Sequence, residues 1–100
     1  MSQICYVITN AAYPEWVKIG FTSKSEMTER LRVYQTGSPF RDYEVYHVVY
    51  FADARMAETE VQARLKLMNA TKSGEWYKMS PRMAANMLDA VYDDLDNGLI

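Results

Sequence analysis

Four polar side chains stand at positions where packing alone does not require them. They are a tyrosine and a lysine within two β patterns, an arginine beside an apolar helical stripe and a glutamate in a later helical pattern: Tyr6, Lys18, Arg30 and Glu58. A carboxylate binds a hard cation such as Mg²⁺ through oxygen, and the planar guanidinium of arginine matches two oxygens of a phosphate. A neighbouring lysine favours the phenolate form of a tyrosine, and a phenolate can accept a proton from water that attacks phosphorus. These residue types therefore match the needs of a phosphodiesterase.

Each of the four residues also has a purely structural explanation. A strand tyrosine usually packs in the core, and a lysine on an edge strand protects against aggregation. Arg30 has the i, i+4 spacing for an ion pair with Glu26, and the carboxylate of Glu58 suits the positive end of a helix dipole. Periodicity alone therefore predicts only a small α+β domain.

The elements that would position Tyr6 and Lys18 are two strands. Residues 3–9 and 16–21 alternate in hydrophobicity, and the residues between them, which include a proline, are typical of a turn. We interpret the pair as an antiparallel hairpin in which the tyrosine and the lysine are near neighbours. Residues 43–51, rich in tyrosine and valine, predict a third strand, and residues 75–79 predict a short extended piece.

Three helices are expected beside these strands. The capping-box spacing of Ser23 and Glu26 predicts that a first helix begins there. Residues 55–68 predict a second helix, which carries Glu58 in its first turn. A serine followed by proline at residues 80–81 predicts the start of a third helix, because serine is a favoured N-cap and proline a favoured first helical residue.

The size of the chain allows one domain. Its 100 residues are 49% hydrophobic and 24% charged, as in an ordinary globular protein, and leave no room for two independent cores. The single cysteine and single histidine exclude an internal disulfide framework and a zinc finger. We therefore expect one α+β domain over residues 1–100, with a small three-stranded antiparallel sheet flanked by about three helices.

The net charge of −2 hides an uneven distribution. Residues 83–100 carry four aspartates and no lysine or arginine, whereas the other 82 residues carry 11 basic and 9 acidic side chains. We expect a weakly basic body and an acidic C-terminal helix or tail from about residue 83. The low net charge argues against tight binding of nucleic acid without excluding it.

The spacing of the four polar residues resembles the GIY-YIG endonuclease family. Ile4-Cys5-Tyr6 stands where that family has Gly-Ile-Tyr, and Lys18-Ile19-Gly20 stands where it has Tyr-Ile-Gly. A branch of the family found in phages, bacteria and fungi is more similar still, over about residues 4–92. It shares six motifs with this chain, in order: Tyr6-Val7-Ile8-Thr9-Asn10, Trp16-Val17-Lys18-Ile19-Gly20, Glu29-Arg30-Leu31, Ser38-Pro39-Phe40, Ala57-Glu58 and Gly74-Glu75-Trp76-Tyr77.

The resemblance implies a role for each matching residue. Tyr6 would be the general base or would position the attacking water, and Lys18, in place of the second tyrosine, would assist it electrostatically. Arg30 would hold the scissile phosphate. Glu58 would bind one divalent cation, Mg²⁺ or Mn²⁺, and Gly20 would permit a close backbone approach at the catalytic face.

Other residues are secondary candidates. Tyr34 is either a second phenol near the phosphate or a core residue, and Glu75 and Trp76 either lock the last loop or contact the substrate. Glu60 lies about 200° around a helix from Glu58, so the two carboxylates do not point into one site. Four basic residues are candidate phosphate contacts or ordinary solvated surface: Lys24, Arg32, Arg41 and Lys72.

The leading hypothesis is a metal-dependent nuclease that makes one hydrolytic cut in DNA, with another nucleic acid or a nucleotide as alternative substrates. A second hypothesis is a module on the same fold that does not cut and binds a nucleotide, nucleic acid or protein. The low net charge favours the second. A third is an oligomerising structural domain that uses exposed aromatic residues. The retained quartet favours the first, because a module freed from catalysis has no physical need for a buried lysine beside a tyrosine.

Substrate targeting is the weak point of the leading hypothesis. Many GIY-YIG nucleases carry a separate DNA-binding domain, which does not fit into 100 residues beside the catalytic module. Binding through its own surface, a homodimer or a partner protein would then supply the targeting. Residues 1–4 lack the basic region of a signal peptide and no apolar run reaches the roughly 18 residues of a membrane span, so we expect a cytoplasmic protein, in the host cytoplasm if it is phage-encoded.

Overall fold

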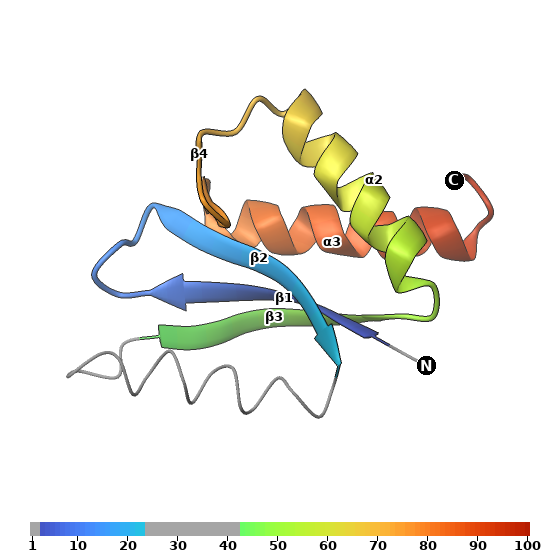
Figure 1. Cartoon of the computed structure of the whole chain (residues 1–100), viewed down its shortest axis with the longest axis horizontal. Helices are drawn as coiled ribbons and strands as arrows, with labels where there is room; N and C mark the ends of the chain where they lie inside the picture. The colour runs from blue at the N-terminus through green and yellow to red at the C-terminus, as the bar shows by residue number, and fades with distance from the viewer. Residues whose placement is uncertain (1–2, 24–42) are drawn as a thin grey trace.

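A five-stranded antiparallel sheet forms the framework of the molecule (Figure 1). The computed structural model describes residues 3–23 and 43–100. The strand order is β3-β1-β2-β5-β4. The bounds of the strands are β1 Gln3–Asn10, β2 Trp16–Ser23, β3 Tyr43–Phe51, β4 Lys72–Ser73 and β5 Trp76–Lys78. The predicted α+β class and the β1–β2 hairpin are confirmed.

The prediction of three strands is wrong, because residues 72–78 form a small hairpin that extends the sheet beyond β2. β5 pairs with the first half of β2, over Trp16–Lys18, and β4 pairs with β5. Gly74 lies between β4 and β5 with a φ of 61°, and glycine adopts this left-handed conformation at little cost in a tight hairpin turn.

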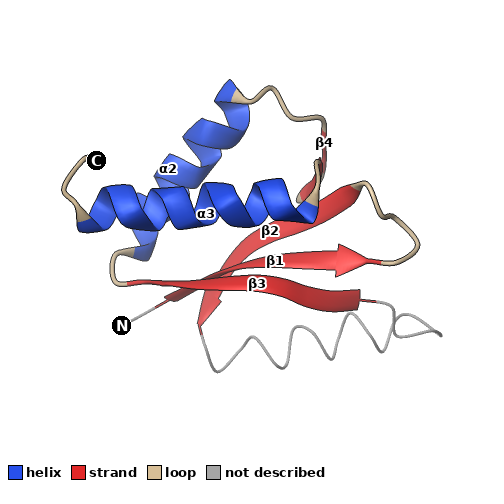
Figure 2. Ribbon diagram, turned by 180° about the vertical axis from the view of Figure 1, so that it is seen from behind, coloured by secondary structure: helices blue, strands red, loops and turns tan. Residues whose placement is uncertain are grey.

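Two helices in the described part of the chain cover one face of the sheet (Figure 2). They are α2, Ala54–Leu67, and α3, Pro81–Asp96. Each begins at a polar N-cap, since the side chain of Asp53 accepts a hydrogen bond from the Met56 amide and that of Ser80 accepts one from the Met83 amide. Both helices are therefore where the sequence predicts them. The helix expected after Ser23 lies outside the described residues.

The sheet has apolar side chains on both faces. The face toward α2 and α3 carries one cluster, in which buried residues of the sheet pack against Val61 of α2 and Leu88 of α3. The opposite face carries a second cluster, made by Ile4, Tyr6 and Ile8 of β1 together with half-buried residues of β3. Because side chains alternate across a strand, Tyr6 belongs to the face away from α2.

The acidic α3 is a packed element of the fold, and two of its aspartates bind basic side chains. Asp89 lies 2.8 Å from Nε2 of His47 on β3, and Asp94 accepts a hydrogen bond from Arg64 of α2. Arg64 also donates to Glu60, one turn earlier in the same helix. These contacts tie α3 to the sheet and to α2. Neither described helix has the length and apolar composition to cross a membrane.

Candidate functional site

The side chain of Tyr6 lies directly over the backbone of β2. Tyr6 and Gly20 are Cα partners in the β1–β2 register, and the tyrosine is almost completely buried. A Cβ atom added to Gly20 would lie 2.5 Å from the Tyr6 hydroxyl oxygen and 2.7 Å from Cζ. Any side chain at this position would force the phenol ring or the strands to shift, so glycine allows Tyr6 to lie this close to β2.

A cleft of about 440 Å³ opens beside this pair. It lies where the pairing of β5 with β2 ends, so the next residues of β2 form one wall and α2 forms another. Tyr6 reaches the cleft from the sheet face away from α2, and Glu58 reaches it from α2 itself. The lining residues are Tyr6, Ile19, Gly20, Phe21, Glu58, Val61, Gln62, Lys72, Glu75 and Tyr77.

Glu58 and Glu60 lie on different sides of α2. Glu58 lines the cleft, and its carboxylate is close enough to the Cys5 thiol of β1 to influence it electrostatically. Glu60 instead accepts a hydrogen bond from Nε of Arg64 at 3.0 Å, on the side where Arg64 also binds α3. The 100° rotation per helical residue separates the two carboxylates, as the sequence predicts.

Lys18 lies two residue pairs further along the hairpin than Tyr6. Its Cα partner on β1 is Ile8, so it is a diagonal neighbour of Tyr6 on the same face rather than the residue directly opposite. Its Nζ lies 3.2 Å from Oε2 of Glu75, and Glu75 lines the cleft. The lysine side chain is only 12% exposed, whereas that of Glu75 is 70% exposed. Lys18 does not line the cleft itself, and its link to the cleft is the ion pair with Glu75, which does.

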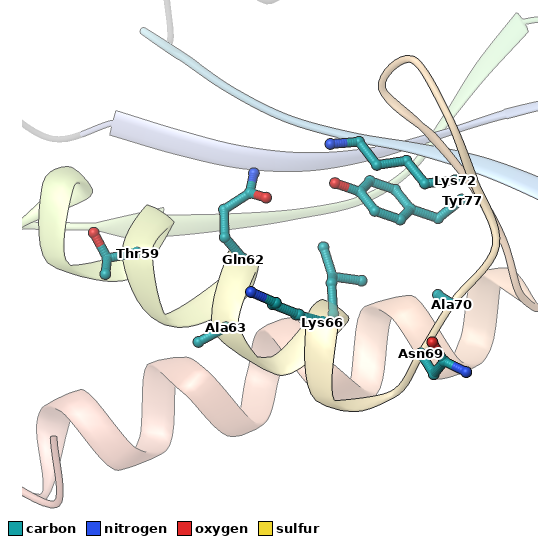
Figure 3. Close-up of a pocket in the computed structure, with 9 residues that line it drawn as sticks. Thr59, Gln62, Ala63, Lys66, Asn69, Ala70, Lys72 and Tyr77 are labelled. Atoms are coloured by element: carbon teal, nitrogen blue, oxygen red, sulfur yellow. The ribbon is translucent and has the colours of Figure 1, made fainter.

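Lys72 brings a positive charge to the rim of the cleft. Its Nζ lies 5.6 Å from the ring centroid of Tyr77. A second hollow of about 540 Å³, between α2 and the β4–β5 hairpin, shares Gln62, Lys72 and Tyr77 with the cleft and adds Lys66. Figure 3 shows Gln62 pointing from α2 toward Lys72 and Tyr77. Lys72 is therefore placed where it could contact a phosphate.

A family comparison matches nearly the whole folded unit. The family model of the T5orf172 domain matches residues 3–93, which include all the described strands, α2 and most of α3. The chain belongs to the T5orf172 domain family. This domain is found in phage and bacterial nuclease-like proteins, and it suggests a nuclease-like or DNA-binding module. Comparisons with curated proteins and with solved structures gave no significant match.

The donor set in the cleft of this T5orf172 domain suits one kind of metal. Among residues 3–23 and 43–100 there is no group of three or more His, Cys, Asp or Glu side chains arranged around a common point. The cleft offers the carboxylates of Glu58 and Glu75. Mg²⁺ is usually held by one or two carboxylates, several waters and the oxygens of a substrate phosphate. The residues present therefore fit Mg²⁺ better than a metal that needs a complete protein cage.

Several predicted site residues of the T5orf172 domain fall outside the described residues. Arg30, the predicted phosphate-binding arginine, and Tyr34, the possible second phenol, are two of them. The others are three predicted phosphate contacts: Lys24, Arg32 and Arg41. Of the quartet, the structure brings Tyr6 and Glu58 to one cleft and places Lys18 beside it.

Two polar side chains of the cleft, Gln62 and Tyr77, are not among the site residues that the sequence predicts. Gln62 follows Glu58 by four residues, and side chains at this spacing share one face of a helix. Tyr77 ends the Gly-Glu-Trp-Tyr motif and is buried on the helix-facing side of β5. The helical spacing could have identified Gln62, whereas Tyr77 depends on the pairing of β5 with β2.

The buried Cys5 thiol of this domain provides a test of the packing beside Glu58. Burial raises the pKa of Cys5 well above its ordinary value, and the Glu58 carboxylate raises it further. We expect no reaction with a disulfide reagent at pH 8 in the folded protein, and labelling only at the rate of unfolding. Since the thiol ionises in the unfolded chain above about pH 8.5 and stays protonated in the fold, its contribution to stability is lost as pH rises beyond that value. Rapid labelling without denaturant would contradict this packing.

Proposed function

We propose that this T5orf172 domain is a metal-dependent phosphodiester hydrolase that cuts DNA, with an active site of the GIY-YIG type. The observation that carries the proposal is that Tyr6 and Glu58, from opposite sides of the sheet, line one cleft together with Gly20. In a shared polar cleft, a phenol can accept a proton and a carboxylate can hold a cation, and both actions assist the hydrolysis of a phosphodiester by water.

The protein's own residues would divide the chemistry as follows. Tyr6, as the phenolate, would take the proton from water as the water oxygen attacks phosphorus. The P–O bond to the leaving group breaks, and the leaving oxygen keeps the electron pair and takes a proton from solvent. Lys18, on the same sheet face, would assist Tyr6 electrostatically. Arg30 would bind two phosphate oxygens and offset the negative charge that develops on them.

Glu58 would hold the divalent cation, Mg²⁺ or Mn²⁺, and Glu75 stands in the same cleft as a second carboxylate. When bound, such a cation polarises the phosphate oxygens and stabilises their charge. Lys72 at the rim would contact an adjacent phosphate of the strand. DNA is the proposed partner, with targeting through the domain's own surface, a second copy or another protein, and the proposed location is the cytoplasm.

A cleavage assay on defined nucleic acids tests the proposal. Duplex, single-stranded and branched DNA, and RNA of the same sequences, are incubated with Mg²⁺, with Mn²⁺ or with EDTA. We expect cleavage of DNA with either metal, none with EDTA, and loss of cleavage in Arg30→Ala at unchanged stability. Absence of cleavage under every condition, together with tight binding of a nucleotide or nucleic acid, would replace the proposal with the non-cutting module. Equal cleavage by wild type and Arg30→Ala would remove the arginine from the site.

A further inference from the structure

A separate pocket at the turn end of the sheet is lined almost entirely by aromatic side chains. Its volume is about 350 Å³, and its lining residues are Tyr13, Trp16, Tyr43, Ser73 and Trp76. They come from the β1–β2 turn, from β2, from the start of β3 and from the β4–β5 hairpin. The fold therefore gathers four aromatic rings from distant parts of the chain around one small space.

The pocket retains substantial apolar exposure. Tyr13 is 57% exposed, and the two tryptophans and Tyr43 are half-buried. The rings of Tyr43 and Trp76 lie 6.2 Å apart between centroids with an angle of 48° between their planes. The backbone holds Tyr13 in place on both sides, because its amide donates to the Asn10 carbonyl and its carbonyl accepts from the Trp16 amide. Exposed aromatic groups fixed in this way are typical of a binding site.

The surroundings of the pocket indicate what it would bind. Glu15 and Glu75 precede the two tryptophans in the sequence and form ion pairs, Lys78 with Glu15 and Lys18 with Glu75. The polar residue Ser73 is among the residues that line the pocket. A flat aromatic ligand with polar edges matches such a lining, and nucleobases stack on aromatic side chains in sites that hold single strands. The volume lies within the range of small-molecule sites and is small for a protein segment.

The position of the pocket connects it with the cleft. Trp16 and Gly20 lie on the same face of β2, because side chains alternate between the two faces of a strand. They are about 13 Å apart along the strand, at roughly 3.3 Å per residue. Lys18 stands between them on that face. A nucleic-acid strand that extends about this far from the cleft would reach the aromatic rings.

We propose that this aromatic pocket binds an unstacked nucleobase of the strand whose phosphate occupies the cleft. The inference rests on the proposed function for its orientation, since the cleft defines where the strand begins. The pocket would anchor the strand by stacking, which depends little on base identity. It would also add affinity that the low net charge of the domain does not supply.

Intrinsic fluorescence tests the pocket directly, because both tryptophans of the chain line it. The probe is a short single-stranded oligonucleotide, added in EDTA so that no cleavage occurs, and compared with an abasic strand of the same length and charge. We expect saturable quenching by the oligonucleotide and little by the abasic strand. Tyr13→Ala should weaken binding about 10-fold, in the range of one lost stacking contact.

Tyr46→Ala is the matched control, since Tyr46 is similarly exposed, at 50%, but does not line the pocket. It should leave the affinity unchanged. Equal quenching by the abasic strand, or equal affinity of Tyr13→Ala and wild type, would overturn the base-binding pocket whether or not the protein cuts DNA. Quenching by the base-containing strand alone, in a protein that does not cut, would overturn the hydrolase and retain the pocket.

Discussion

Replacement of Glu58 by glutamine is expected to lower the rate of DNA cleavage by about 10²–10³-fold, the usual size of the loss when one electrostatic contributor to a transition state is removed. Glutamine keeps the shape of the side chain but removes the negative charge that would hold Mg²⁺ in the cleft. Because Glu58 is exposed, its replacement should leave the free energy of unfolding nearly unchanged. The measurement is the single-turnover cleavage rate across a Mg²⁺ titration, with the variant requiring more metal.

Glu60→Gln is the matched control, since it makes the same chemical change two residues further along α2. Glu60 binds Arg64 on the side toward α3, so its replacement should cost at most about 1 kcal/mol of stability and leave the cleavage rate of the folded protein unchanged. A wild-type rate in Glu58→Gln, or equal losses in the two variants, would show that the cleft does not hold the metal.

Gly20→Ala is expected to damage both stability and cleavage. The added methyl group would lie 2.5 Å from the Tyr6 hydroxyl oxygen, so the ring or the two strands must move. Overpacking of a buried contact costs about 1–3 kcal/mol, which urea denaturation would measure. Displacement of the hydroxyl should also lower cleavage to the level of Tyr6→Phe, which we expect to lose about 10²–10⁴-fold as a missing general base.

The comparison of Gly20→Ala with Tyr6→Phe separates packing from chemistry. The phenylalanine variant keeps the ring and removes the hydroxyl, whereas the alanine variant keeps the hydroxyl and displaces it. If both changes act on the same group, the double variant should cleave no more slowly than Tyr6→Phe alone. Wild-type stability and rate in Gly20→Ala would mean that the tyrosine has room to move without consequence.

The parts of the fold that the sequence predicts are those with strong local signals. Alternation over residues 3–9 and 16–21 identifies β1 and β2, and a high content of tyrosine and valine identifies β3. An apolar stripe identifies α2, and the N-cap Ser80 followed by Pro81 identifies the start of α3. The short extended piece predicted over residues 75–79 contains β5, whereas β4, with two residues, is too short for a sequence pattern to be recognised. That β5 joins the sheet through β2, and β4 through β5, is a tertiary interaction.

In the candidate site, too, features with a local sequence signal could be predicted, whereas features that depend on tertiary pairing could not. The separation of Glu58 from Glu60 comes from helix geometry alone, and the prediction of one carboxylate in the cleft could be made without coordinates. The register of the β1–β2 hairpin could not, because residues 11–15 form a connection whose turns determine which residues face each other. The aromatic pocket was also beyond prediction, since its members come from elements that only the sheet order brings together.

The composition of the cleft also has a consequence for biosynthesis. Its walls come from β1 near the start of the chain, from α2 in the middle and from Tyr77 on β5 close to the end. A nascent chain on the ribosome therefore holds Tyr6 long before the segment that completes the cleft has been translated. The lining of the cleft is complete only once residue 77 has been translated, and a fragment that ends before β5 lacks Tyr77 from its wall.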